Sequence, residues 1–374
     1  MPQGTRTKGK VGHMELELLK GPLDSSWLVR IANLYGRFNL KYADARFCGR
    51  VFNENPSGFS LHAVLVDKDA QLVGHYGIVP GEVVADGASV RAGKGEAFVV
   101  HPDHRGLQVA VGGDAPVASG LVMPLHLYRL AESEGLELVH MMTSPDVGQL
   151  HRMTGCRSLP IPNQRWVLTV RPLSAATVTN PARGAIAVGL AGAQWSAAAA
   201  VLKVSQIAGT PFREWRAADI PARWLARVQA DMQPRHGWGL TLDSGALRWQ
   251  IGVGDMRLIS PGEDSKDFAL VCPRADQDRI MEIVCWHQPR ADQRSALRLM
   301  GAIVRSARAA GNCRISFSEG AAGDTASLSS LRTAGRTLFF RARPTMSRMY
   351  LRTNNRYFLA AENLRYTPFF YAAF

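Results

Sequence analysis

The sequence predicts an α/β protein in which helices flank a mixed, mostly antiparallel sheet (an α+β arrangement), and it predicts this unit twice. Short apolar strands alternate with amphipathic helices across residues 60–170, and a similar order returns after residue 280. The chain has 374 residues, more than one hydrophobic core normally supports. Hydrophobic residues make up 46% and charged residues 20% of the chain, which excludes a disordered protein.

The first half begins with a polar, Gly-rich stretch, residues 1–12, in which we expect a disordered tail. Apolar residues at helical spacing then predict a helix over residues 26–42, with a cap at Ser25 or Ser26. We expect the further strands at residues 61–66, 72–79, 82–85, 89–92, 96–100, 136–142 and 165–170, and the further helices at residues 121–134 and 146–154.

The second half repeats part of this order. Strands are expected at residues 281–285 and 313–317, and an amphipathic helix over residues 292–310. A short helix at residues 328–334 follows. The glycines that end the two helices, Gly311 and Gly335, are spaced much as Gly135 and Gly155 are in the first half, which indicates an internal duplication.

Between the two halves lies an Ala- and Gly-rich run, Ala185 to Gly209. Because it contains Gln194, Lys203 and Gln206, it would insert poorly into lipid, and we expect a packed helix or a connector. The domain organisation predicted from these patterns is listed in order: a tail at residues 1–12, a first domain at residues 13–175, a connector at residues 176–210 and a second domain at residues 211–374.

The chain is basic, with a net charge of +13 and a pI of about 9.9. A basic surface attracts anions, such as a CoA pyrophosphate or an acidic carrier protein. Nucleic-acid binding is not expected, because the arginines are spread along the chain. The five cysteines form no CxxC pair, and the N-terminus has no apolar signal core, so we expect a reducing, cytoplasmic location without a zinc site.

The most specific pattern runs from Glu96 through Pro102 to Arg105 and Gly106. A strand ends there, proline prevents its continuation, and an Arg-Gly pair opens a Gly-rich loop before a helix. This arrangement directs backbone N–H groups and the positive end of a helix at one point, which suits a phosphate.

Three segments, FVVHPDHRG, SGLVMPLHLYRLAESEG and LHRMTGCR, resemble the acetyl-CoA-binding core of the GNAT (GCN5-related N-acetyltransferase) superfamily. The resemblance covers about residues 60–170, and the two halves together resemble the tandem-domain members. It implies two GNAT-like domains in tandem and acetyl-CoA, or another acyl-CoA, as co-substrate.

Carried over residue by residue, the resemblance implies an acyl-donor site of two parts. The backbone of Phe98, Val99 and Val100 matches the strand edge that pairs with the pantetheine arm. The residues that match the start and the end of the pyrophosphate loop are Arg105, Gly106, Ser119, Gly120 and Leu121.

The chain departs from the family at residues 107–118, where the family pattern has essentially no residues. Three outcomes are open. The insert forms a surface excursion that leaves the phosphate loop intact, or it rebuilds the loop with Gly112 and Gly113, or it has abolished CoA binding.

Acyl transfer to an amine needs a base for the amine and an acid for the leaving thiolate. The resemblance implies Glu96 as the base, and His151 stands where the family often has a tyrosine that acts as the general acid. Each residue also has a non-catalytic interpretation: Glu96 as a solvated or salt-bridged side chain, and His151 as a surface histidine. His101 and His104 are expected to make local contacts, and Cys156 is expected to be a buried thiol rather than a nucleophile.

The second half has no Arg-Gly loop, so we expect it to shape the acceptor site rather than to catalyse. Five tryptophans are candidates for that site or for the core: Trp215, Trp224, Trp238, Trp249 and Trp286. The expected activity is transfer of a short acyl group from acyl-CoA to a small-molecule amine. An acyl carrier protein as donor, a non-catalytic binding protein and, less favoured, a transferase that uses aminoacyl-tRNA are the alternatives.

Overall fold

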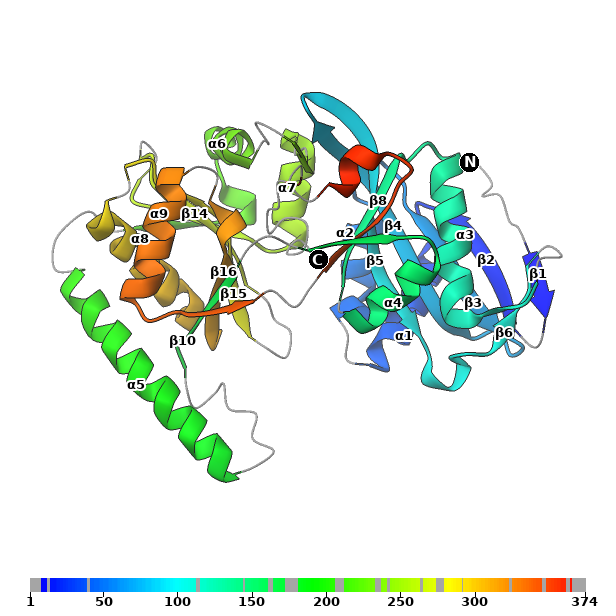
Figure 1. The fold of residues 1–374 in the computed structure, drawn as a ribbon, viewed down its shortest axis with the longest axis horizontal. Coiled ribbons are helices and arrows are strands. Elements are labelled where there is room, and N and C mark those ends of the chain that lie inside the picture. The colour runs from blue at the N-terminus through cyan, green and yellow to red at the C-terminus, as the bar shows by residue number, and fades with distance from the viewer. Residues whose placement is uncertain are drawn as a thin grey trace.

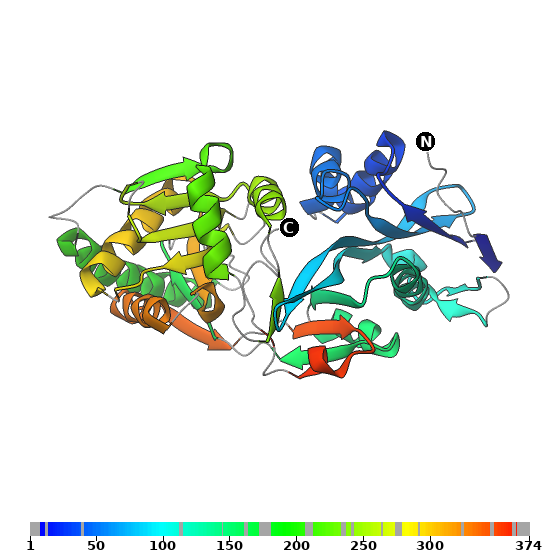
Figure 2. The same ribbon diagram turned by 90° about the horizontal axis from the view of Figure 1, so that it is seen from above.

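The structure is a computed structural model. It describes residues 8–11, 14–38, 41–111, 115–143, 145–160, 164–171, 181–205, 212–232, 237–240, 243–262, 265–273, 279–290, 292–322, 325–344, 348–360 and 364. These residues form two lobes, each built on a sheet with helices on both faces (Figures 1 and 2).

The first sheet has the order β1-β2-β3-β4-β5-β8-β18-β9, and β12 pairs with the far half of β4. The strands are β1 (Lys8–Val11), β2 (Met14–Lys20), β3 (Leu61–Asp67), β4 (Leu72–Ala85), β5 (Ala88–Val100), β8 (Leu138–Thr143), β9 (Arg157–Pro160), β12 (Trp238–Leu240) and β18 (Arg348–Arg352). β1 corrects the expected disordered tail, because residues 8–11 pair with β2.

The strands β4 and β5 form one long hairpin instead of the separate short strands expected from the sequence. Asp86 and Gly87 make its turn with φ values of 47° and 85°. Two central residues with positive φ are what a tight hairpin turn between twisted strands requires. This turn lies between the strands expected at residues 82–85 and 89–92.

Four helices cover the first sheet, two on each face: α1 (Ser25–Gly36), α2 (Ala45–Phe52), α3 (Ser119–Ser133) and α4 (Pro145–Met153). α1 ends at Gly36, earlier than predicted, and its N-cap is Asp24 rather than a serine, since the Asp24 side chain accepts a hydrogen bond from the N–H of Trp27. α3 begins two residues earlier than predicted, so Pro124 lies inside it.

The second sheet has the order β11-β13-β14-β15-β16-β10-β17. Its strands are β10 (Gln164–Thr169), β11 (Arg213–Arg216), β13 (Arg257–Ser260), β14 (Phe268–Pro273), β15 (Ile280–His287), β16 (Arg314–Ser318) and β17 (Arg341–Pro344). Its helices are α5 (Pro181–Ser205), α6 (Ala222–Met232), α7 (Ser244–Val253), α8 (Gln293–Ala309) and α9 (Thr325–Thr337).

The two halves exchange one strand each. β18, from the end of the chain, lies between β8 and β9 in the first sheet, and β10 lies between β16 and β17 in the second. The expected boundary at residue 175 therefore does not separate the sheets, because it assigns β10 to the first domain and β18 to the second. Strand partners are chosen by long-range pairing, which periodicity along the chain cannot show.

The lobes also share a hydrophobic core. Residues from α1 and α2 pack in one cluster with residues from α6, α7, β13 and β14. The indole N–H of Trp249 on α7 donates to the carbonyl of Arg50 on α2 at 2.8 Å. This continuous packing holds the two lobes in one arrangement.

α5 occupies the run in which a packed helix or connector was expected. It lies along the outside of the second lobe (Figure 1), where Ala198 and Leu202 are buried and it contacts α8 and β10. Among the described residues no helix combines the length and the apolarity that a bilayer crossing needs.

Candidate functional site

The centre of the first sheet contains a place where two neighbouring parallel strands stop pairing. β5 and β8 pair through Ala92–Leu138, Gly93–Val139 and Lys94–His140, and no further pair is formed although both strands are described beyond these residues. The edge of β5 that faces β8 is therefore unpaired by that strand from residue 95 to residue 100. Backbone amide groups there can bind an extended ligand.

A β-bulge in β5 lies at the start of this edge. His75 of β4 pairs with Val99 and Gly77 pairs with Glu96, so Ala97 and Phe98 together stand opposite one residue. Ala97 has a φ of 59°, a left-handed conformation that is rare for residues with a side chain. Bulges of this kind commonly redirect side chains next to active sites.

Glu96 is half-buried and held by two side chains. The Tyr42 hydroxyl donates to its Oε2 at 2.8 Å, and Nζ of Lys94 lies 2.5 Å from its Oε1. The side chains of Lys94 and Glu96 are each 11% exposed. Glu96 therefore forms the salt bridge that its non-catalytic interpretation expects. Its carboxylate also lies at the beginning of the unpaired edge.

The loop after β5 brings its two ends together. Arg105 donates from Nε to the carbonyl of Val100 at 3.1 Å, and Gly106 has a φ of 78°. Ser119 donates from its N–H to the carbonyl of Leu107 at 2.8 Å and from its hydroxyl to the carbonyl of His104 at 2.6 Å. The expected start and end of the phosphate loop are thus neighbours in space.

α3 begins at this closure without a capping side chain, because its N-cap residue is Ala118. Its first turn, which contains Gly120 and Leu121, also lacks an acidic residue. The first N–H groups of a helix have no partner within the helix, and together with the helix dipole they attract anions. The arrangement suits a phosphate group beside Arg105.

The insert forms a β-hairpin made of β6 (Gln108–Val109) and β7 (Val117–Ala118). Val109, Ala110 and Val111 are buried, and Val109 and Val111 belong to the core that α3 covers. The base of the insert is closed, as an intact phosphate loop requires, but these three residues are packed and do not form a surface excursion. Gly112 and Gly113, on which a rebuilt loop would depend, lie outside the described residues.

His151 on α4 is buried and is not the surface histidine that was one of its two readings. Its Nδ1 lies 2.7 Å from the hydroxyl of Tyr128, and its ring packs near Phe98 and Tyr350. Burial lowers the pKa of His151 to about 4. The imidazole is therefore neutral at neutral pH and cannot supply an imidazolium proton there.

The other candidate side chains make local contacts, as expected. Nε2 of His104 lies 3.9 Å from Oδ2 of Asp67, and Nδ1 of His101 lies 3.6 Å from Oδ2 of Asp103. Burial raises the pKa of the Cys156 thiol to about 11, so it is not a ready nucleophile. All five cysteines are free and buried.

In the second half of the chain, three of the candidate tryptophans are buried. Trp286 at the end of β15 is fully buried, bridges to Ala322 and donates from Nε1 to the hydroxyl of Ser330 on α9 at 2.9 Å. Trp224 and Trp238 are also fully buried. These three tryptophans belong to the core rather than to an acceptor site.

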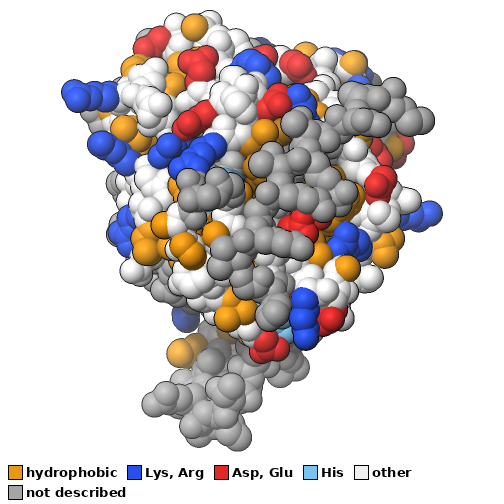
Figure 3. All heavy atoms as spheres, turned by 90° about the vertical axis from the view of Figure 1, so that its right-hand side faces the viewer, with side chains coloured by type: hydrophobic (Ala, Val, Ile, Leu, Met, Phe, Trp, Pro, Cys, Tyr) orange, Lys and Arg blue, Asp and Glu red, His pale blue; other side chains and the backbone are white. Residues whose placement is uncertain are grey.

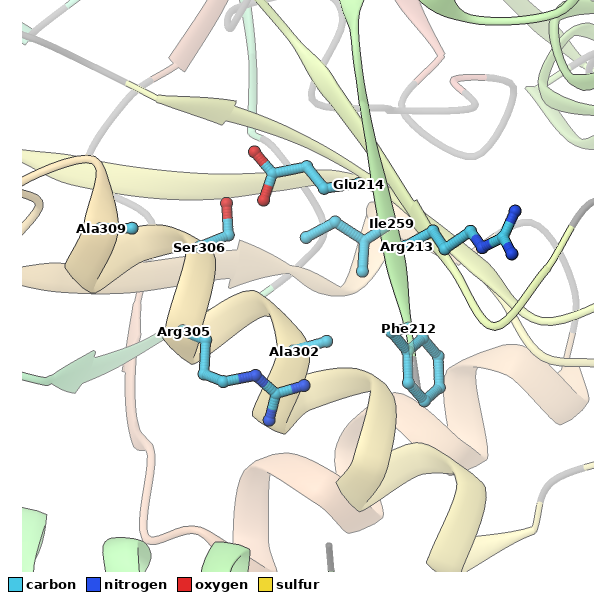
Figure 4. Close-up of a pocket in the computed structure, with 8 residues that line it drawn as sticks. All are labelled: Phe212, Arg213, Glu214, Ile259, Ala302, Arg305, Ser306 and Ala309. Carbon is cyan, nitrogen blue, oxygen red and sulfur yellow. The ribbon is translucent and has the colours of Figure 1, made fainter. Parts of the chain in front are cut away.

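A hollow of about 200 Å³ in the second lobe lies between β11 and α8 (Figure 4). Glu214 and Ser306 line it from the strand and from the helix, and Arg257 already binds the Glu214 carboxylate at 2.8 Å. It contains no candidate from the donor site. Within the described part of the chain, no cluster of His, Cys, Asp and Glu is suited to a metal ion.

The first lobe shows no single basic face in the view of Figure 3. Its Lys and Arg side chains alternate with Asp and Glu side chains.

Sequence reasoning missed Tyr42, Lys94 and Tyr128. Tyr42 was placed in a continuous helix, but it lies in a short 3₁₀ turn between α1 and α2 and reaches Glu96, which is 54 positions away in sequence. Lys94, two residues before Glu96 on one strand, was the one contact that alternation along a strand could have indicated.

Over 90% of its length the chain is similar to a tandem GNAT protein from the clavulanic acid biosynthesis pathway, with 13% identity and a TM-score of 0.51, and it covers 98% of that chain. The chain has the tandem GNAT fold.

A GCN5-related N-acetyltransferase from Anabaena variabilis is similar over the same share of this chain, with 12% identity, a TM-score of 0.51 and 73% of that chain covered. No family model and no curated protein matches the sequence. The predicted fold class, two GNAT-like domains in tandem, is confirmed.

Proposed function

We propose that this tandem GNAT protein is an N-acyltransferase that moves an acetyl or other short acyl group from acyl-CoA to an amine of a small molecule. The observation that carries the proposal is the unpaired edge of β5, residues 96–100, which leads directly to Arg105 and the uncapped start of α3. A strand edge suits the amides of pantetheine, and a helix N-terminus suits a pyrophosphate.

In this proposal the backbone of Phe98, Val99 and Val100 pairs with the pantetheine arm. The pyrophosphate lies against the closed loop, whose residues are Arg105, Gly106, Ser119, Gly120 and Leu121. Ser119 is buried and has its own partners, so its part is to hold the loop closed. No metal takes part in the proposed reaction.

Glu96 is the proposed base. The amine attacks the thioester carbonyl, the C–S bond breaks, and the amine proton passes to Glu96 directly or through a water molecule. Tyr42 and Lys94 fix the carboxylate, although each oxygen keeps a lone pair for a proton. Because Tyr42 packs with the core under α1 and α2, the amine is expected to approach from that side of the sheet.

The leaving thiolate also needs a proton. His151 was the candidate acid, but its lowered pKa leaves it neutral, and burial raises the pKa of its partner Tyr128. Neither group is a good donor in that state. We assign the proton to water and give His151 a structural part, in which it packs beside Phe98 under the donor edge.

An acyl carrier protein is the alternative donor, because the net charge of +13 suits an acidic partner and because the insert interrupts the phosphate loop. The hairpin closes at Leu107 and Ser119, which removes the second reason. Arg105 and the uncapped start of α3 favour acyl-CoA as the donor in this proposal.

The test is release of free thiol from acetyl-CoA in the presence of a panel of small amines, compared between the wild-type protein and Glu96→Gln. We expect amine-dependent release that falls at least about a hundredfold in the variant, as general base catalysis contributes. Absence of CoA binding at micromolar concentration would overturn the proposal. Binding of CoA with equal rates in both proteins would refute the role of Glu96.

A further inference from the structure

A row of four hydrogen-bonded, buried polar side chains connects the start of β3 to the bulge in β5. Ser60 Oγ lies 2.7 Å from His62 Nε2, and His62 Nδ1 lies 3.0 Å from His75 Nε2. His75 Nδ1 lies 3.1 Å from the hydroxyl of Tyr35, which also bonds the carbonyl of Ala97. Ser60, His62 and His75 are 0% exposed and Tyr35 is 2% exposed.

The last acceptor determines the direction of every bond in this row. A carbonyl oxygen only accepts, so Tyr35 must donate its single hydroxyl proton to Ala97 and can only accept from His75. His75 therefore carries its proton on Nδ1. Its Nε2 is then the acceptor for the Nδ1–H of His62, provided that both rings are neutral.

Burial keeps both rings neutral. It lowers the pKa of His75 to about 3, and burial together with the neighbouring His75 lowers the pKa of His62 well below its usual range. His62 then offers a bare Nε2 to the hydroxyl of Ser60. The result is one ordered row of donors that ends at Ala97.

The bulge at Ala97 places the neighbouring side chains on opposite faces of the sheet. In a regular strand Glu96 and Phe98 would point to the same face. Here Glu96 contacts Tyr42 under α1 and α2, whereas Phe98 packs against Tyr76 and His151 under α3 and α4. The strained φ of Ala97 is what separates the proposed base from the donor side.

We propose that the row Ser60–His62–His75–Tyr35 is a positioning device that holds the Ala97 carbonyl in its left-handed bulge and so sets the position of Glu96. The inference rests on the proposed function for its kinetic consequence, but not for its structural one. Tyr35 is a positioning residue, because it acts on the reaction through the backbone of β5 and through its ring contact with Tyr42, which donates to Glu96.

The structural half is tested by ¹⁵N NMR of histidine-labelled protein and by ¹³C shifts of Ala97, which report the sign of φ. We expect His62 and His75 to be neutral Nδ1–H tautomers from pH 5 to pH 8. We also expect Tyr35→Phe to move the Ala97 shifts toward those of an extended residue. An Nε2–H tautomer of His75, or an unchanged Ala97, would overturn the proposal in active and inactive protein alike.

The kinetic half is tested by a double-mutant cycle. Tyr35→Phe should lower kcat about tenfold or more, since small displacements of a catalytic group can cost up to about a hundredfold. Glycine adopts a positive φ without strain, so in an Ala97→Gly background the same change should cost less than threefold. Equal losses in both backgrounds would mean that Tyr35 acts through Tyr42 or by filling space, and would overturn the role of the Ala97 carbonyl.

Ser330→Ala is the matched control. It removes another buried hydroxyl that is hydrogen-bonded to a ring, at 2.9 Å from Trp286 in the second lobe. We expect lower stability and an unchanged kcat. If the wild-type protein releases no thiol, the proposed function fails while the NMR measurement still decides the role of the row.

Discussion

Lys94 and Glu96 form a close ion pair on β5, with 2.5 Å between Nζ and Oε1, at the last position where that strand pairs with β8. The pair joins a structural contact to the proposed base. It holds the carboxylate of Glu96 at the beginning of the unpaired edge, where the proposed base is needed.

The first prediction concerns this pair. Lys94→Met should lower kcat for thiol release about tenfold or more, because the side chain that holds Oε1 of Glu96 is lost and small displacements of a catalytic group can cost up to about a hundredfold. The measurement is the steady-state rate of thiol release. Lys68→Met, at an exposed turn, is the control and should leave kcat unchanged; an unchanged kcat in Lys94→Met would contradict the role of the pair.

The second prediction concerns the phosphate site. Arg105→Ala should raise the Kd of acetyl-CoA about tenfold or more, because a hydrogen bond to a charged group contributes about 1.5–3 kcal/mol. The KM of a truncated pantetheine thioester without phosphates should not change. Calorimetry measures the Kd of acetyl-CoA, and steady-state kinetics measure the KM of the truncated thioester. Equal effects of Arg105→Ala on both donors would mean that Arg105 does not contact the phosphates.

The third prediction concerns the insert. Replacing residues 108–117 with two glycines should preserve CoA binding within about threefold, because Leu107 and Ser119 already meet at the hairpin base. It should lower the free energy of unfolding by about 3 kcal/mol or more, since Val109 and Val111 leave the core. Urea denaturation and CoA titration test both, and lost CoA binding in a folded variant would show that the insert itself forms the site.

The fourth prediction concerns pH and stability. Burial lowers the pKa of His75 and His140 to about 3 and of His151 to about 4, against about 6.5 in the unfolded chain. The unfolded state therefore binds more protons as the pH falls below 6.5. Each histidine should cost up to about 1.4 kcal/mol of stability per pH unit until its folded pKa is reached.

Denaturant unfolding at pH 7 and at pH 5 measures this loss. His151→Gln should reduce the slope by the share of one histidine, and an exposed control substitution such as Lys68→Gln should not. An identical slope in His151→Gln would mean that His151 is already charged in the folded protein.

The fifth prediction concerns the strand exchange. Residues 1–175 expressed alone should aggregate, because they lack β18 and leave β10 without its partners. A chain that joins residues 1–160 to residues 345–374 should be more soluble than the 1–175 fragment and fold cooperatively by circular dichroism, since it restores β18 between β8 and β9 and omits the unpartnered β10, although it lacks β12. A soluble, folded 1–175 fragment would show that the exchange is dispensable.

The sequence alone determined the element types and the donor loop. Period-two and helical apolar patterns placed strand segments within β4 and β5 and the helices α3, α4 and α8, although they divided the long hairpin into shorter strands. The proline and glycine signals around Pro102 and Gly106 located the loop after β5. These signals are local: each depends on residues within about one turn or one strand of each other.

Only the tertiary structure decided the rest. The exchange of β10 and β18, the contact of Tyr42 with Glu96 and the row from Ser60 to Ala97 all join residues distant in the chain. The neutral state of His151 also required the fold, because burial lowers its pKa and burial belongs to the packed molecule. The chain encodes its strands locally, but long-range packing chooses their partners and sets the charge of the site.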